Sequence, residues 1–253
     1  MSKLLDTQLL IGGLVGFYQA IFARKNKLSV TNFPRIEHQG KVAHIFGSGA
    51  SAIDTKVLLN RDTHAFGCNL TLGLLPSWHV GFIERLENDP FGKQQMEILM
   101  DREFSALILK NNYPLKENKT EKNIQLLQTK HRNLSVLKEC QIIGKRDNLD
   151  RILKYVLDEK TEVITQYASS ILTMIVYAIK CGYRNIVLHG VDHGGACFYD
   201  YEPFKKYKFG VTKRIDMQHQ TDGYTVPFSS VLEQSIIRLA SVGITIKYAK
   251  ELL

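Results

Sequence analysis

The stretch that most constrains the fold of this chain lies at residues 41–69. An apolar run typical of a buried strand, residues 41–46, ends in Gly-Ser-Gly-Ala-Ser at positions 47–51 and is followed by helical spacing over residues 54–59. Gly47 and Gly49 allow the backbone to come close to a ligand, and amides at the start of a helix attract an anion. A strand, a tight turn and a helix in this order predict an α/β fold with a nucleotide site at the turn.

The turn itself matches neither of the common phosphate-binding patterns. The dinucleotide fingerprint requires a third glycine and the phosphate loop requires a lysine, and both are missing after Gly49. A plain turn without a ligand would carry the same residues. The interpretation as a nucleotide site therefore depends on the rest of the chain.

Composition narrows the class of protein. The 253 residues, 44% hydrophobic and 23% charged, suit either one globular α/β domain with an inserted or appended lid or two small domains. A net charge of +8 favours an anionic partner, but no zinc-finger, homeodomain or RNA-recognition signature accompanies it, so we expect no nucleic acid. The four cysteines are scattered without a Cys-x-x-Cys pair, which argues against structural zinc and a disulfide framework and favours the cytoplasm.

The N-terminal part, residues 1–40, is expected to be separate from the body of the domain, residues 41–253. Residues 9–23 are almost uniformly apolar and are followed by basic residues. A helix of this length rises about 22 Å, which is short of the roughly 30 Å hydrocarbon core of a bilayer. One interpretation is peripheral contact with the inner face of the cytoplasmic membrane. The alternative is a helix packed on the protein or in a homo-oligomer contact.

Further strands and helices complete a Rossmann-like, mostly parallel sheet flanked by helices. Strands are expected at residues 63–68, 78–83, 105–110, 136–143, 184–192 and 244–248, and helices at 149–157, 169–181 and 229–241. Residues 111–133 are polar and basic and read as a loop or mobile insertion. Because ligands bind at the carboxyl ends of parallel strands, we expect Ser48, Asn69 and Glu84 along one rim. Residues 194–225 mix glycine, aromatic and basic residues without apolar periodicity, which predicts a lid over that rim.

Three passages resemble the bacterial CMP-sialic acid-dependent sialyltransferases, glycosyltransferase family 42, and the related CMP-keto-sugar transferases. The passages are Ile45 to Ser51, Phe66 to Asn69, and Ser169 through Tyr183 to Asp192, with Phe198-Tyr199-Asp200 following. The resemblance implies a metal-independent, inverting glycosyltransferase that needs no cofactor. It would move a CMP-activated nonulosonic acid, sialic acid-like or Kdo-like, onto a cell-surface glycan or lipid-linked acceptor.

The resemblance also implies roles for individual residues. The residues predicted to hold the donor are Gly47, Ser48, Gly49, Ser51, Asn69, Ser169, Ser170, Asp192 and Tyr199, together with Glu84 from its place at the rim of the sheet. His219 falls where the family carries its catalytic histidine, and His193 is the competing base. Candidates that stabilise the leaving phosphate are Tyr201, Lys206, Tyr207 and Arg214. The chain departs from the family at Ala50, which replaces a proline, and in lacking the tyrosine that precedes the catalytic histidine.

Two other functions stay open at the level of sequence. The first is an NAD-dependent oxidoreductase on the same fold class, which is disfavoured because the third fingerprint glycine is missing and Asn69 stands where an acidic residue is expected. The second is a non-catalytic nucleotide-binding scaffold protein.

Overall fold

The computed structural model describes residues 20–21, 23–30, 33, 41–60, 63–84, 86, 90–110, 121–137, 139–141, 149–158, 164–166, 169–207 and 228–253. The strands are β1 (Ser29–Val30), β2 (Val42–Phe46), β3 (His64–Cys68), β4 (Ser77–Ile83), β5 (Glu103–Lys110), β6 (Leu134–Leu137), β7 (Glu139–Gln141), β8 (Ile164–Gln166), β9 (Asn185–His189) and β10 (Thr245–Tyr248). The α-helices are α2 (Ala52–Thr55), α3 (Pro90–Asp101), α4 (Glu121–Lys130), α5 (Leu149–Leu157), α6 (Ser170–Lys180) and α7 (Phe228–Ala240). Short 3-10 turns are η1 (Lys56–Leu58), η2 (Asn69–Gly73), η5 (Phe198–Asp200), η6 (Phe204–Tyr207) and η7 (Ala249–Glu251).

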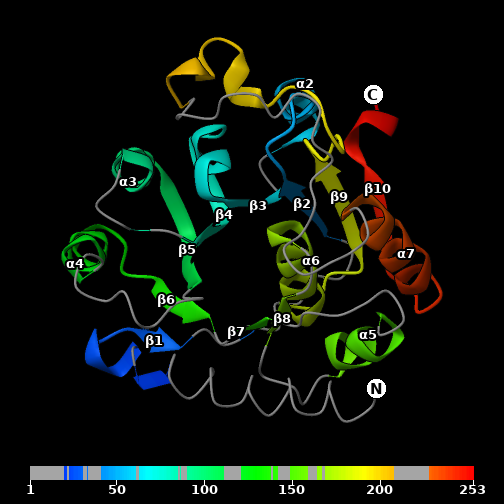
Figure 1. Ribbon diagram of the computed structural model, residues 1–253, viewed down its shortest axis with the longest axis horizontal. Helices are drawn as coiled ribbons and strands as arrows, with labels where there is room; N and C mark the ends of the chain where they lie inside the picture. Colours follow the sequence, from blue (N-terminus) through cyan, green and yellow to red (C-terminus); the bar gives the residue numbers. More distant parts are fainter. Residues whose placement is uncertain are drawn as a thin grey trace.

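A parallel sheet forms the centre of the molecule (Figure 1). Its eight strands follow the order β1-β6-β5-β4-β3-β2-β9-β10, and every neighbouring pair is parallel. A second small sheet pairs β7 with β8. From β2 the chain builds outward to β6 and then returns to place β9 on the other side of β2. The strand order therefore reverses between β2 and β9, the kind of position where open α/β sheets bind ligands.

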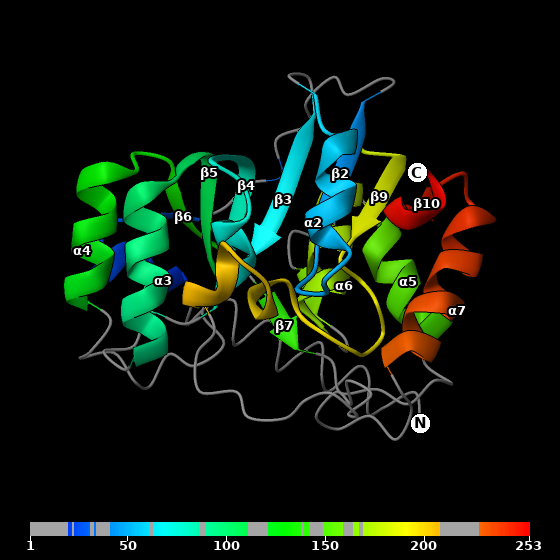
Figure 2. The same ribbon diagram turned by 90° about the horizontal axis from the view of Figure 1, so that it is seen from above.

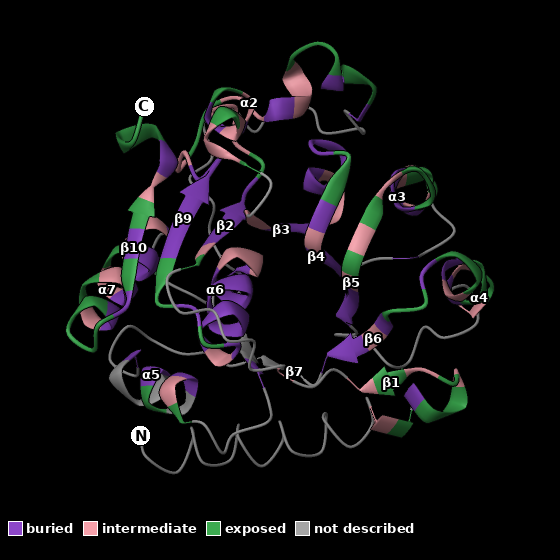
Figure 3. Cartoon of the chain, turned by 180° about the vertical axis from the view of Figure 1, so that it is seen from behind, coloured by how far each residue is buried: buried purple, intermediate pink, exposed green. Residues whose placement is uncertain are grey.

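Helices cover both faces of this sheet, as its nearly continuous apolar strands require. Ala43 and Ile45 of β2 pack into the core under α5, α6 and α7, whereas Phe46 packs into the core under α2, α3 and α4. Figure 1 shows these two groups of helices on opposite sides of the sheet, and Figure 3 shows the buried strands between them. Seen from above, the segment with η5 and η6 lies beside the ends of β2 and β3 (Figure 2). The predicted α/β class with a parallel sheet is confirmed.

Most of the predicted elements are present within a residue or two of their expected bounds. The interpretation of residues 111–133 as a loop is wrong in part, because residues 121–130 form α4 and bury Ile124 and Leu127. The strand expected at 136–143 is divided between β6 and β7, which belong to different sheets. Helix α3 and the strands β1 and β8 were not predicted. Most of the apolar segment 9–23 lies outside the described residues, and no described helix has the length and hydropathy needed to cross a bilayer.

Candidate functional site

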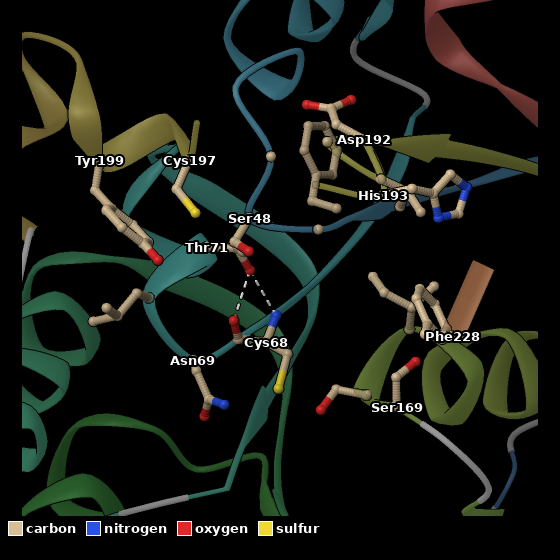
Figure 4. Close-up of a pocket in the computed structure, with 18 of the residues that line it drawn as sticks. Ser48, Cys68, Asn69, Thr71, Ser169, Asp192, His193, Cys197, Tyr199 and Phe228 are labelled. Carbon is tan, nitrogen blue, oxygen red and sulfur yellow. Dashed lines mark hydrogen bonds between the residues drawn. The ribbon is translucent and has the colours of Figure 1, made fainter. Parts of the chain in front are cut away.

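A pocket of about 370 Å³ lies at the carboxyl ends of β2, β3 and β9 (Figure 4). The predicted site residues that line it are Gly47, Ser48, Gly49, Asn69, Ser169, Ser170, Asp192, His193 and Tyr199. Residues that line it without having been predicted include Phe46, Cys68, Thr71, Phe91, Met174, Cys197 and Phe228. The fold thus brings together residues 46–71, 169–174 and 190–199, with Phe91 and Phe228, at the point where the strand order reverses.

The turn after β2 is packed directly against the end of β9. The amide of Gly47 donates to the carbonyl of His189 at 2.7 Å, and that of Gly49 donates to the carbonyl of Gly190 at 2.8 Å. A Cβ on Gly47 would lie 2.5 Å from the Gly190 oxygen, and one on Gly49 would lie 2.3 Å from Oδ2 of Asp192. These glycines are therefore required by the contact between two backbone segments, apart from any ligand.

Ser51 and Asp192 join the two sides of this contact. The Ser51 hydroxyl donates to Oδ1 of Asp192 at 2.5 Å, and the Ser51 amide donates to Oδ2 at 3.0 Å. The next amide back, that of Ala50, donates to the carbonyl of Ala196 at 3.0 Å. The amides expected to hold an anion thus donate within the protein. The part of the turn that lines the pocket is Gly47 to Gly49, while Ser51 lies behind it.

A charged network lies under two of the residues that line the pocket. Glu84 accepts hydrogen bonds from Asn69 Nδ2 at 2.9 Å, from Lys110 Nζ at 2.5 Å and from the Ser170 hydroxyl. Burial alone would raise the pKa of Glu84, but the Lys110 ammonium and the three hydrogen bonds hold that pKa below its ordinary value. Asn69 and Ser170 line the pocket, whereas Glu84, which was predicted to hold the donor directly, contacts them from behind.

A neutral chain of side chains supports the turn from inside the sheet. Nδ1 of His44 lies 2.8 Å from Nε2 of His189, whose Nδ1 lies 2.9 Å from the hydroxyl of Thr55. That hydroxyl donates its single proton to the carbonyl of Ser51 at 2.8 Å. His189 must therefore donate from Nδ1 and accept at Nε2, so His44 donates from Nδ1. Burial lowers the pKa of His44 to about 4, and burial together with His44 lowers the pKa of His189 to about 3.

His193 lies at the edge of the pocket, and its backbone adopts the left-handed conformation that favours glycine. Its φ is +57°, and its Nε2 lies 3.0 Å from the hydroxyl of Tyr248. Its Nδ1 is buried and has no hydrogen-bond partner among the residues that the structure describes. Burial lowers the pKa of His193, helped by Lys250 and opposed by nearby carboxylates, chiefly that of Glu233. The ring is therefore favoured in its neutral form, which is the form a general base needs.

The predicted lid residues are only partly described. Tyr199 lines the pocket, but Tyr201, which is 48% exposed, and Lys206 do not. Tyr207 is buried against Gly73 and accepts a hydrogen bond from Arg102 at 3.2 Å, so it packs the segment onto the body of the domain. Arg214 and His219 lie outside the described residues.

Two residues that shape the site gave no usable signal in the sequence. The Thr71 hydroxyl donates to the carbonyl of Cys68 at 2.7 Å and accepts from its amide at 2.8 Å, which closes the turn after β3 (Figure 4). Lys110 ends β5 and is 1% exposed, although lysine is rarely buried unless it is paired. No group of metal-binding side chains occurs within the described part of the chain.

Comparisons with known proteins identify the fold. No protein-family model matches the chain, and no curated protein matches it. Among solved structures, the monofunctional α-2,3-sialyltransferase Cst-I from Campylobacter jejuni superposes with a TM-score of 0.50 at 16% identity, covering 87% of this chain and 79% of that one. The fold of this chain is similar to that of Cst-I. The Campylobacter jejuni sialyltransferase CstII, in complex with CMP-3FNeuAc, matches at 16% identity over 83% of this chain and 81% of that one, with a TM-score of 0.44.

Proposed function

We propose that this chain is a glycosyltransferase that uses a CMP-activated sugar of the nonulosonic acid class as its donor. The observation that carries the proposal is the pocket between β2, β3 and β9, in which most of the residues predicted to hold the donor lie together. The Cst-I fold extends over 87% of the chain and supports the same conclusion. The transferred sugar is sialic acid-like or Kdo-like, and the acceptor is a cell-surface glycan or a lipid-linked glycan.

The chemistry of transfer requires one proton acceptor. As the acceptor hydroxyl attacks the anomeric carbon, it loses its proton to a base, and CMP departs with a growing phosphate charge. Transfer in this proposal inverts the anomeric carbon and uses neither a metal nor a cofactor. His193 supports the role of base because its buried Nδ1 has no hydrogen-bond partner among the described residues, while His219 is the base implied by the resemblance.

The site of action in this proposal is the cytoplasm, at the inner face of the cytoplasmic membrane. The net charge of +8 supports contact with anionic lipid and with an acidic lipid-linked acceptor. Residues 9–23 and the basic residues after them would supply the peripheral contact.

The decisive experiment is calorimetric titration of the purified protein with CMP, UMP and NAD in the presence of a chelator. We expect CMP to bind selectively, followed by turnover of CMP-sialic acid or CMP-Kdo with a glycan acceptor. Binding of NAD alone would instead indicate an oxidoreductase. A scaffold protein would bind CMP but turn over neither donor, and its CMP affinity would be unchanged in His193→Ala and His219→Ala variants.

A further inference from the structure

Asn69 and Ser170 line the pocket in front of Glu84, and we call these two residues the pocket floor. Glu84 determines which of their atoms donate and which accept hydrogen bonds. Oδ1 of Asn69 accepts from the Glu84 amide at 3.0 Å and from Nε2 of Gln95 at 3.2 Å, so both lone pairs of that oxygen are used. One N–H of Asn69 and the only proton of the Ser170 hydroxyl go to the Glu84 carboxylate. Toward the pocket, Asn69 is left with an N–H and Ser170 with oxygen lone pairs.

Lys110 makes this arrangement compatible with an anionic ligand. A carboxylate next to the floor would repel a phosphate or a sugar carboxylate, and for Glu84, whose side chain is 23% exposed, this repulsion is stronger than in bulk water. The Lys110 ammonium lies 2.5 Å from Oε1 of Glu84 and its side chain is 1% exposed, so the two charges offset each other. Neither Glu84 nor Lys110 lines the pocket, and both therefore act through other residues.

We propose that Glu84 and Lys110 form a positioning pair, in which Glu84 anchors Asn69 and Ser170 and Lys110 keeps the floor electrically neutral toward an anionic nucleotide. The inference rests on the proposed function, because it takes the pocket to be the nucleotide site. Under this proposal, nucleotide affinity depends on two residues that do not themselves line the pocket. The pair joins the ends of β4 and β5, two strands away from the turn after β2.

Three variants separate the two roles of the pair. Lys110→Met leaves the carboxylate unpaired. Glu84→Gln with Lys110→Met is neutral and keeps the shape of the anchor with one of its two acceptor oxygens, whereas Glu84→Ala with Lys110→Met is neutral without an anchor. Lys25→Met removes the same charge from an exposed pair with Glu121 and is the matched control. Affinities for CMP and for uncharged cytidine are measured by calorimetry, and Lys110→Gln replaces Lys110→Met if the latter does not fold.

We expect Lys110→Met to weaken CMP binding by about tenfold or more and cytidine binding by much less, because only CMP carries a charge for the carboxylate to repel. The neutral Gln variant should regain part of the CMP affinity, because the repulsion is removed and its carboxamide oxygen still accepts one of the two hydrogen bonds. The neutral Ala variant should lose about tenfold for both ligands, since the floor loses its hydrogen bonds. The control should bind both ligands as the unaltered protein does.

Two results would overturn the positioning pair while leaving the proposed function intact. One is equal weakening of CMP and cytidine in Lys110→Met without recovery in the Gln variant, which would show a general structural role. The other is identical affinity of the Gln and Ala variants, which would show that Glu84 anchors nothing. Failure of the unaltered protein to bind CMP would instead overturn the proposed function, and the positioning pair with it.

Discussion

At the scale of single residues, two pocket-lining side chains, those of Asn69 and His193, stand on a backbone with positive φ. His193 adopts φ +57°, a conformation that costs free energy in any residue with a Cβ. Its ring is fixed by the Tyr248 hydroxyl at 3.0 Å, and burial raises the pKa of Tyr248 to about 12, so that hydroxyl stays protonated. The hydroxyl can donate to Nε2 or accept from it, and only the second arrangement leaves a lone pair on Nδ1.

This geometry predicts the effect of removing either partner. We expect His193→Ala to lower kcat by about 100-fold or more with little change in CMP affinity, since a general base contributes about that much. Tyr248→Phe keeps the ring but releases the imidazole, and we expect a smaller loss in kcat. Steady-state kinetics with CMP-sialic acid or CMP-Kdo provides the measurement. An unaltered kcat in His193→Ala, together with its loss in His219→Ala, would assign the base to His219.

At the scale of elements, the contact between the turn after β2 and the end of β9 decides whether the pocket forms. The backbones meet so closely that a single methyl group at position 47 would overlap the Gly190 carbonyl. The neutral chain from His44 through His189 to Thr55 fixes the same contact from the interior of the sheet. The two elements therefore behave as one unit.

We expect Gly47→Ala to lower the free energy of unfolding by about 1–3 kcal/mol, the usual cost of overpacking, and to weaken CMP binding at the same time. Urea denaturation and calorimetry measure the two effects. Ser48→Ala, in the same turn, adds no atom near Gly190 and serves as the control for stability. A Gly47→Ala protein as stable as the unaltered one would show that the contact is looser than the structure indicates.

The sequence predicted the elements of the β2 turn well because local patterns determine them. Apolar runs, turn glycines and the residue at each strand end are visible without knowledge of distant contacts. Helix α4 was missed because its residues are mostly polar and only Ile124 and Leu127 are buried. The role of Lys110 could not be predicted, since its burial depends on a partner 26 residues away in the sequence.

At the scale of the whole molecule, the neutral histidine pair makes stability depend on pH. His44 and His189 are neutral in the fold but titrate near pH 6.5 in the unfolded chain. Below that pH the unfolded state binds more protons than the folded state, so the free energy of unfolding falls as the pH falls. The loss continues to about pH 4 for His44, and above about pH 6.5 this contribution is constant.

We expect each histidine to contribute a slope of up to about 1.4 kcal/mol per pH unit within that window. Urea denaturation at pH values between about 4 and about 8 measures the slope. A His44→Asn protein should show a shallower dependence, because one of the two groups is removed. If the slopes of the two proteins are the same, the buried pair does not control acid sensitivity.

The strand order of the sheet has a further consequence for how the protein is made. His44 and His189 are in contact although 145 residues separate them in the sequence. On one side β2 pairs with β3, the next strand in the sequence, and on the other side it pairs with β9, which comes much later. The pairing of β2 with β9 joins segments far apart in the sequence, so it waits for a late part of the chain to leave the ribosome. A nascent chain that ends before β9 contains six of the eight strands of the sheet but lacks one side of the pocket. Nucleotide affinity would then appear late in synthesis, as a property of the nearly complete polypeptide.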